Sequence, residues 1–375
     1  MSFPIIVNRS DISRKVVLKM VEIWKVKREL LRIWQQIKAP VSIILSPMLR
    51  HWHDFRKEKL SRYTQGSLPL QNDVAVLLVY RPAGLLASHF ETAKHLAKNG
   101  FAPLVIVNHK LDDSDRRALA VLSWTLIERP NTGYDFGGYR DAVLFLRERN
   151  IFPKTLVFLN DSVWYPVKKD DGLLSEVRGA SCDLYGFAKD RHKRSNKPEF
   201  IQSFFFAFKG DVIGSDVFYR YWLKLPMYNN KWAVIRLLEM KLSPYFERHG
   251  YSTDAKFEKS TFPIAIAQSE RKRQIAYLYC PEAQLGSEAR QIENCLQSGA
   301  QLSLEEWQSI VALGRVDGHI LKCSPALLFD VLDVTMLKKL GHGHFVKQRR
   351  AIVSGKYLDT FCRSIAEEIE NWDKS

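Results

Sequence analysis

Short apolar runs alternate with helical patterns between residues 74 and 159, and this alternation constrains the fold more than any other feature. Strands are predicted at 74–80, 104–108, 124–127 and 155–159, and helices at 85–99 and 114–122. Continuous apolar strands in the order β-α-β-α-β indicate a mostly parallel sheet with helices on both faces. Ligands of such sheets bind beyond the C-terminal ends of the strands.

The segment after the third strand, NTGYDFGG at 131–138, is rich in glycine. Glycine permits positive φ and close backbone approach, and a helix predicted at 139–149 would turn its N-terminal amides toward an anion. The segment is neither a P-loop nor a dinucleotide-binding fingerprint, because no Gly-Lys-Ser/Thr follows and the glycine spacing is wrong. Asn131 and Asp135 at this turn favour a ligand-binding role over a purely structural one.

The fourth strand ends in a second polar segment, Asn160-Asp161-Ser162. A carboxylate where a hydrophobic strand ends is well placed to bind a divalent cation or a ribose. The alternative is that Asp161 caps the next turn. A parallel sheet would bring Asp135 and Asp161 to the same edge, and this predicts a site for a phosphorylated donor.

Several motifs in this order resemble the rhamnan synthesis protein F family, bacterial glycosyltransferases of polysaccharide assembly. They are Asn-x-Gly-x-Asp-Phe-Gly-x-Tyr at 131–139, Asn-Asp-Ser and a proline at 160–166, aromatic segments at 200–205 and 218–222, and a helix that ends before a Gly-Tyr turn at 244–251. The resemblance covers roughly residues 74–255. It does not extend to the basic N-terminal segment or to residues 281–375.

The resemblance implies an α/β fold with a GT-A-like, mostly parallel sheet, and an inverting transfer of rhamnose or a related deoxyhexose. The implied donor is a nucleotide-sugar such as dTDP-rhamnose. The implied acceptor is a lipid-linked or polysaccharide chain of a bacterial polysaccharide or lipopolysaccharide. The expected donor-binding residues are Asn131, Gly133, Asp135, Asn160, Asp161, Ser162, Gln202 and Ser203. GT-A folds often hold a divalent metal on an Asp-x-Asp. Here Asp161 is the one carboxylate, so we expect Mg²⁺ or Mn²⁺ at Asp161, or the ribose instead.

Catalysis by such an enzyme needs charge stabilisation on the leaving diphosphate and a base for the acceptor hydroxyl. Residues 189–197, KDRHKRSNK, are a basic loop that either closes over the diphosphate or is simply solvated. Asp190 is the first candidate for the base, followed by His192 and Glu199. Gln202-Ser203 lies among phenylalanines, where it would hydrogen-bond either the sugar or the sheet backbone.

The N-terminal segment carries much of the positive charge: residues 1–60 hold 13 Lys and Arg against 5 Asp and Glu, in a chain of net charge +15. A helix is predicted at 11–38, and Pro40 and Pro47 are expected to end or kink any helix beyond it. Its apolar positions include Val16, Met20, Ile23, Leu30, Trp34 and Ile37. Such a helix either binds an anionic membrane surface or docks on the main domain. His51 and His53 are expected to be a solvated pair.

We expect three parts: a basic helical segment at 1–65, the glycosyltransferase domain at 72–280, and a helical C-terminal region at 281–375. In the last part, helices are predicted at 304–313, 326–340 and 357–372, and Ser303 with Glu306 forms a capping box. Five scattered cysteines favour reduced thiols, and no apolar run has membrane-spanning length. These features favour a cytoplasmic protein, peripheral on the inner face of a bacterial cytoplasmic membrane.

Two other functions use the same features. A nucleic-acid-binding protein would also be basic, but no helix-turn-helix, zinc-finger or RNP-like pattern is present, so we expect no nucleic acid partner. A non-catalytic scaffold of a polysaccharide-assembly complex is the other alternative, and the presence of Asp135 and Asp161 argues against it.

Overall fold

The computed structural model describes residues 9–190, 199–258 and most of 303–372. Within the last range, the described stretches are 303–313, 320–322, 325, 327–341, 344–355 and 357–372, and residues 261, 264, 267 and 268 are also described. Only the backbone is described at residues 9–29, 31, 32, 35, 309–313 and 344.

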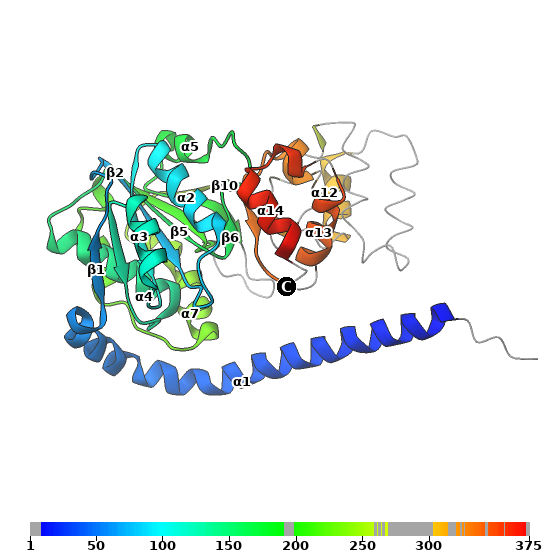
Figure 1. The fold of residues 1–375 in the computed structure, drawn as a ribbon, viewed down its shortest axis with the longest axis horizontal. Helices are drawn as coiled ribbons and strands as arrows, with labels where there is room; N and C mark the ends of the chain where they lie inside the picture. The colour runs from blue at the N-terminus through cyan, green and yellow to red at the C-terminus, as the bar shows by residue number, and fades with distance from the viewer. Residues whose placement is uncertain are drawn as a thin grey trace, which may run out of the picture.

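A mostly parallel sheet forms the centre of the described structure, in the strand order β1-β4-β3-β2-β5-β9-β7-β10, with β8 paired to β7 (Figure 1). The strands are β1 (Arg62–Gln65), β2 (Asp73–Val79), β3 (Phe101–Val107), β4 (Thr125–Glu128), β5 (Thr155–Asn160), β7 (Leu184–Asp190), β8 (Phe200–Ile201), β9 (Phe205–Lys209) and β10 (Thr253–Phe257). Strands β4, β3, β2 and β5 are parallel neighbours. Strand β9 runs antiparallel between β5 and β7, and β1 runs antiparallel along β4.

Helices cover both faces of the sheet, as the sequence predicts. The helices are α2 (Ala87–Lys98), α3 (Asp113–Val121), α4 (Tyr134–Glu148), α5 (Leu173–Gly179), α6 (Asp216–Leu223), α7 (Lys231–Leu237) and α8 (Leu242–Arg248). Alternate residues of each strand point to opposite faces. On β2, Leu77 packs with α2, α3 and α5, whereas Leu78 packs with α4, α6, α7 and α8. The middle parts of the inner strands are therefore apolar on both faces.

The glycine-rich segment folds differently from the prediction, because α4 begins at Tyr134 and not at residue 139. Gly133 is the residue that precedes the helix, and its φ of 78° suits glycine. Gly137 and Gly138 lie inside the helix. A Cβ at Gly137 would collide with the carbonyl oxygen of Thr132, and one at Gly138 with Leu78 Cδ1. These two glycines thus serve close packing and not the turn.

Helix α1 (Arg9–Leu60) is continuous through Pro40 and Pro47, so of the two expected effects, an end or a kink, the end is wrong. Its C-terminal half packs beside α7, while its N-terminal half extends away from the sheet domain (Figure 1). Among the described residues, no helix combines the length and apolar character needed to cross a membrane.

The C-terminal region contains α12 (Leu304–Leu313), η5 (Ile320–Lys322), η6 (Leu327–Val331), β11 (Leu337–Lys338), α13 (His344–Val353), η7 (Leu358–Thr360) and α14 (Arg363–Trp372). The predicted capping box is present, since Ser303 N donates to Glu306 Oε2 at 2.6 Å and Glu306 N donates to Ser303 Oγ at 3.3 Å. The helix predicted at 357–372 is interrupted, because Phe361 forms a β-bridge with Lys168.

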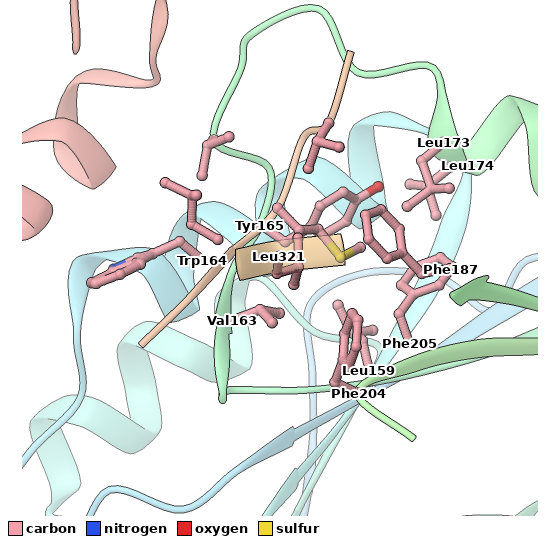
Figure 2. Packing of buried hydrophobic residues seen from close by; sticks show 14 of the residues in the cluster. Leu159, Val163, Trp164, Tyr165, Leu173, Leu174, Phe187, Phe204, Phe205 and Leu321 are labelled. Atoms are coloured by element: carbon pink, nitrogen blue, oxygen red, sulfur yellow. The ribbon is translucent and has the colours of Figure 1, made fainter. Parts of the chain in front are cut away.

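The helix predicted at 326–340 is wrong beyond its first turn. A single π-helical turn, η6, is followed by Asp333 with a φ of 47° and then by β11, which pairs antiparallel with β6 (Val163–Trp164). Most apolar residues of this stretch are buried, but beyond the first turn they are buried from an extended segment and not from a helix. Figure 2 shows Leu321 packed beside Tyr165, so the C-terminal region shares a core cluster with the sheet domain.

Candidate functional site

The two polar motifs meet at one edge of the sheet. Asn160 ends β5 and Asp161 and Ser162 come directly after it, while Asp135 lies in the first turn of α4. Asn160 Nδ2 donates to Asp135 Oδ2 at 2.9 Å. Ser162 N and Oγ donate to Asn160 Oδ1 at 3.2 and 2.6 Å, which fixes the orientation of this amide. The parallel strands therefore bring the motifs into side-chain contact.

Carboxylates gather around this contact and perturb one another. Burial, followed by the charges of Asp161 and Glu239, raises the pKa of Asp135 to about 6. Burial also raises the pKa of Asp161. Two effects lower it in part: the hydrogen bond that Tyr80 N donates to Asp161 Oδ2 at 2.8 Å, and the charge of Lys339. Perturbed carboxylates at the C-terminal edge of a parallel sheet are typical of a functional site.

His89 is a site residue that the sequence did not reveal. Its Nδ1 accepts a hydrogen bond from Leu86 N at 3.1 Å, so the proton of the neutral ring lies on Nε2. This buried Nε2 has no hydrogen-bond partner among the described residues and lies 3.9 Å from Asp161 Oδ2. Burial and the charges of Lys339 and Arg81 hold the pKa of His89 well below its usual range. A neutral N–H donor is thus left for a ligand oxygen.

Two consecutive lysines from the C-terminal region lie on either side of Asn160-Asp161-Ser162. Lys338 Nζ donates to Ser162 Oγ at 3.0 Å, and Lys339 Nζ donates to Ser88 Oγ at 2.7 Å. Burial lowers the pKa of Lys338 to about 8, although Glu239 and Asp135 oppose the shift, and burial also lowers the pKa of Lys339. No sequence motif marks these lysines.

Glu368 of α14 holds Lys339 in place. Its carboxylate accepts hydrogen bonds from Ser88 N at 2.9 Å, Ser88 Oγ at 3.0 Å and Trp164 Nε1 at 2.7 Å, and it lies 3.6 Å from Lys339 Nζ. The C-terminal helix is therefore part of the wall of the site.

Gln202 and Ser203 lie buried between β8 and β9. Ser203 N and Oγ donate to Glu239 Oε1 at 2.9 and 3.0 Å, and Tyr139 Oη donates to Ser203 O at 3.1 Å. Gln202 Nε2 donates to Asp190 Oδ2 at 3.3 Å, while its Oε1 is buried with no partner in the described part of the chain. The structure links Ser203 to the Asp135 cluster through Glu239.

Of the three candidates for the catalytic base, the structure describes Asp190 and Glu199 but not His192. Asp190 is the last residue of β7 and pairs with Phe200 of β8, and Glu199 directly precedes β8. Residues 191–197 of the basic loop, His192 among them, lie outside the described residues. Lys189 Nζ donates to Thr253 O at 3.1 Å and lies 3.2 Å from Glu258 Oε1. Lys189 is therefore part of strand β7, and its ammonium group is bound to residues of β10 and its C-terminal end.

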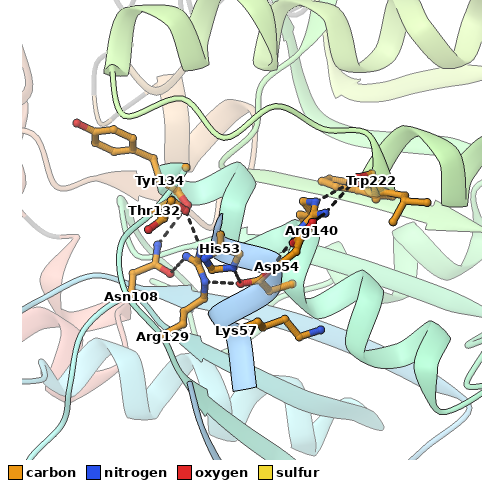
Figure 3. A network of polar contacts seen from close by, with 12 residues as sticks. His53, Asp54, Lys57, Asn108, Arg129, Thr132, Tyr134, Arg140 and Trp222 are labelled. Atoms are coloured by element: carbon orange, nitrogen blue, oxygen red, sulfur yellow. Dashed lines mark hydrogen bonds and ion pairs between the residues drawn. The ribbon is translucent and has the colours of Figure 1, made fainter. Parts of the chain in front are cut away.

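A buried polar network lies beneath the glycine-rich turn (Figure 3). Asn108 Nδ2 donates to Asn131 Oδ1 at 3.0 Å, and Arg129 Nη1 donates to Asn108 Oδ1 at 2.6 Å. Arg129 Nε donates to Asp141 Oδ2 at 2.6 Å, and the same oxygen accepts from His53 Nε2 at 2.8 Å. Although burial opposes ionisation, Arg129 and His53 hold the pKa of Asp141 well below its usual range.

The expectation of a solvated histidine pair is therefore wrong for His53, which is fully buried, while His51 is exposed. Basic neighbours in sequence concealed the inward position of His53 on α1. A second chain of hydrogen bonds connects α1 with the glycine-rich turn. Asn229 N donates to Ser42 Oγ of α1 at 3.1 Å, and Gly133 N donates to Asn229 Oδ1 at 3.2 Å.

The residues fit a divalent cation only in a limited way. Within the described ranges, no group of three or more His, Cys, Asp or Glu side chains converges as a metal cage. Asp161 and its neighbour Asp135 could supply one or two oxygen ligands. Mg²⁺ is commonly held by one or two carboxylates together with substrate phosphates and water.

The fold is that of an α/β protein, and charged side chains gather at the C-terminal edge of its mostly parallel sheet. The family model described as "Rhamnan synthesis protein F" matches residues 104–276. The chain is also 33% identical over 361 residues to the uncharacterized protein y4gN of Sinorhizobium fredii (strain NBRC 101917 / NGR234), covering 95% of this chain and 93% of that protein. The chain belongs to the rhamnan synthesis protein F family, which links it to polysaccharide synthesis.

Proposed function

We propose that the protein is a glycosyltransferase of the GT-A type, which moves rhamnose or a related deoxyhexose from a nucleotide-sugar to a bacterial cell-surface polysaccharide or lipopolysaccharide. The observation that carries this proposal is the contact of Asn160 with Asp135, which joins two family motifs where ligands of parallel sheets bind. An antiparallel strand, β9, between β5 and β7 is consistent with a GT-A-like sheet.

The site offers a group for each part of the reaction. Asn131, Asp135 and Asn160 would position the donor, of which dTDP-rhamnose is our first candidate. Asp190 would take the proton of the acceptor hydroxyl in an inverting transfer, and Glu199 and His192 are the further candidates. A Mg²⁺ or Mn²⁺ ion, if used, would take Asp161 as one ligand and the phosphates of the donor as others.

Attachment to an anionic membrane surface would bring the enzyme to a lipid-linked acceptor on the inner face of the cytoplasmic membrane. Helix α1 supports this part of the proposal, because its exposed apolar side chains recur at steps of three and four: Trp34, Ile37, Val41, Ile44, Met48, Trp52 and Phe55. Ile44 is 75% exposed and Phe55 87% exposed. Lys38 and Arg56 lie at turns beside this stripe and would face lipid phosphates.

Titration of the full chain with dTDP-rhamnose and with UDP- and GDP-sugars tests the proposal, with and without Mg²⁺, together with an assay of nucleoside diphosphate release. We expect one donor to bind and to be turned over in the presence of acceptor. Asp135→Ala and Asp161→Ala should abolish transfer with the fold retained, whereas the exposed Asp216→Asn should not. Retained turnover in either site variant would reject the site.

The two alternative functions predict different results in these experiments and in a mobility-shift assay with nucleic acid. A non-catalytic scaffold would bind none of the nucleotide-sugars and release no nucleoside diphosphate. A nucleic-acid-binding protein would shift generic DNA or RNA in a salt-dependent manner. Either result without donor binding would overturn the glycosyltransferase proposal.

A further inference from the structure

The C-terminal region places two cations against the motif at the end of β5. Strand β11 pairs with β6, directly after Asn160-Asp161-Ser162, and Lys339 N donates to Ser162 O at 3.0 Å. Lys338 and Lys339 are consecutive, and their ammonium groups donate to Ser162 and to Ser88. The backbone pairing therefore holds both lysines next to the motif.

Among the residues that the structure describes, Lys338 has no direct ion pair. Within the described residues, no carboxylate oxygen lies within 4 Å of its Nζ, which contacts Ser162 Oγ and lies 4.0 Å above the Phe204 ring centroid. Asp135 and Glu239 attract it from farther away. A partly buried ammonium has three donors, and a hydroxyl takes one of them.

Lys339 lies in the same cluster as Asp161 and His89. Its ammonium lies near Asp161 and is held by Ser88 and Glu368. Within the described chain, the unpartnered His89 Nε2 belongs to a side chain that is 2% exposed, and it lies 3.9 Å from Asp161 Oδ2. An acceptor-rich anion here would satisfy a neutral N–H donor and two ammonium groups together.

We propose that Lys338 and Lys339, with His89, bind the diphosphate of the nucleotide-sugar donor and stabilise the nucleoside diphosphate as it leaves. The proposal rests on the proposed function and names residues outside the family-matched range for its donor site. In the transfer, the bond between the anomeric carbon and the diphosphate oxygen breaks, and its electron pair stays on that oxygen. The acceptor oxygen bonds to the carbon, and its proton passes to the base. The two ammonium groups would offset the charge that develops on the leaving oxygen.

Calorimetric titration of dTDP and dTMP into the full chain, at fixed ionic strength, tests this assignment. Lys338→Gln and Lys339→Gln should each weaken dTDP binding about tenfold or more, because each removes one charged hydrogen bond to phosphate. Binding of dTMP should weaken less, and Lys338→Arg should recover part of the dTDP affinity. The exposed Lys94→Gln is the matched control and should bind as the unchanged chain does.

Two outcomes separate this inference from the proposed function. If the unchanged chain binds dTDP and dTDP-rhamnose and both glutamine variants bind dTDP equally well, the diphosphate assignment fails and the glycosyltransferase stands. If the unchanged chain binds no nucleotide or nucleotide-sugar, the proposed function itself fails. Circular dichroism and thermal melting check folding, and if one variant is misfolded the other still decides. Equal weakening of dTDP and dTMP would also reject a role for the lysines at the diphosphate.

Discussion

His53 Nε2 on α1 donates to Asp141 Oδ2 on α4 at 2.8 Å, across 88 residues of sequence. Asp141 also accepts from Arg129, which contacts Asn108, and Asn108 contacts Asn131 in the glycine-rich turn. Four hydrogen bonds thus connect the N-terminal helix to the proposed donor site. The C-terminal half of α1 therefore belongs to the folded domain, and it helps to hold the glycine-rich turn in position through this chain of hydrogen bonds.

His53→Ala should destabilise the fold by about 3 kcal/mol, since it removes one partner of a buried carboxylate. Urea unfolding measures this change in the free energy of unfolding. His51→Ala is the matched control, because His51 is exposed on the same helix, and it should change stability by less than about 0.5 kcal/mol. Equal effects of the two substitutions would show that the network adds nothing to stability.

Gly138→Ala should destabilise the fold by about 1–3 kcal/mol, because the new methyl group would collide with Leu78 Cδ1 between α4 and β2. Thermal or urea unfolding measures the loss. The control is Gly172→Ala, where a Cβ meets no atom within 4 Å and φ is −92°. Similar stabilities of the two variants would contradict the packing role of Gly138.

Asp135 should make stability depend on pH, because its pKa is raised from 3.8 to about 6. The folded state binds this proton more tightly than the unfolded state, so the stabilisation is fully present below about pH 4 and is lost as pH rises through 6. Asp135→Asn should therefore gain stability relative to the unchanged chain between pH 4 and 7, by at most about 3 kcal/mol.

Urea unfolding of both chains at several pH values measures that difference, in which the other carboxylates cancel. Asp216→Asn, at an exposed position on α6, is the matched control for the loss of one carboxylate. A difference for Asp135→Asn that stays constant with pH would contradict the raised pKa of Asp135.

The exposed stripe of α1 should bind vesicles that contain anionic phospholipid. Ile37→Glu with Ile44→Glu should lower sedimentation with such vesicles, because both positions are exposed and apolar, and burying two carboxylates in the interface is unfavourable. Gln36→Glu with Arg50→Gln changes the charge of the same helix away from the stripe and should lower sedimentation less. The stripe would instead be a contact between two copies if the first variant sediments normally, and if the unchanged chain forms a dimer that this variant does not form.

The sequence predicted what local patterns control. Strands β2, β3 and β5 are continuous apolar runs, so their approximate positions and a mostly parallel sheet could be predicted, although β3 begins at Phe101 and not at residue 104. Asp135 and Asp161 were accordingly expected at one edge of the sheet. Lys338 could not be found in this way, since 326–340 has helical apolar spacing and becomes extended only by pairing with β6. The inward position of His53 likewise depends on α4, a distant part of the chain.

The pairing of β11 with β6 also has a consequence for the order of events on the ribosome. Asp135 and Asp161 emerge early in synthesis, but Lys338, Lys339 and the Glu368 that holds Lys339 emerge only near the end of the chain. A nascent chain can assemble its parallel strands long before it has the groups proposed to bind diphosphate. A protein shortened to the family-matched residues would lose those cations, and it would also lose the central strand β2, which lies between β3 and β5.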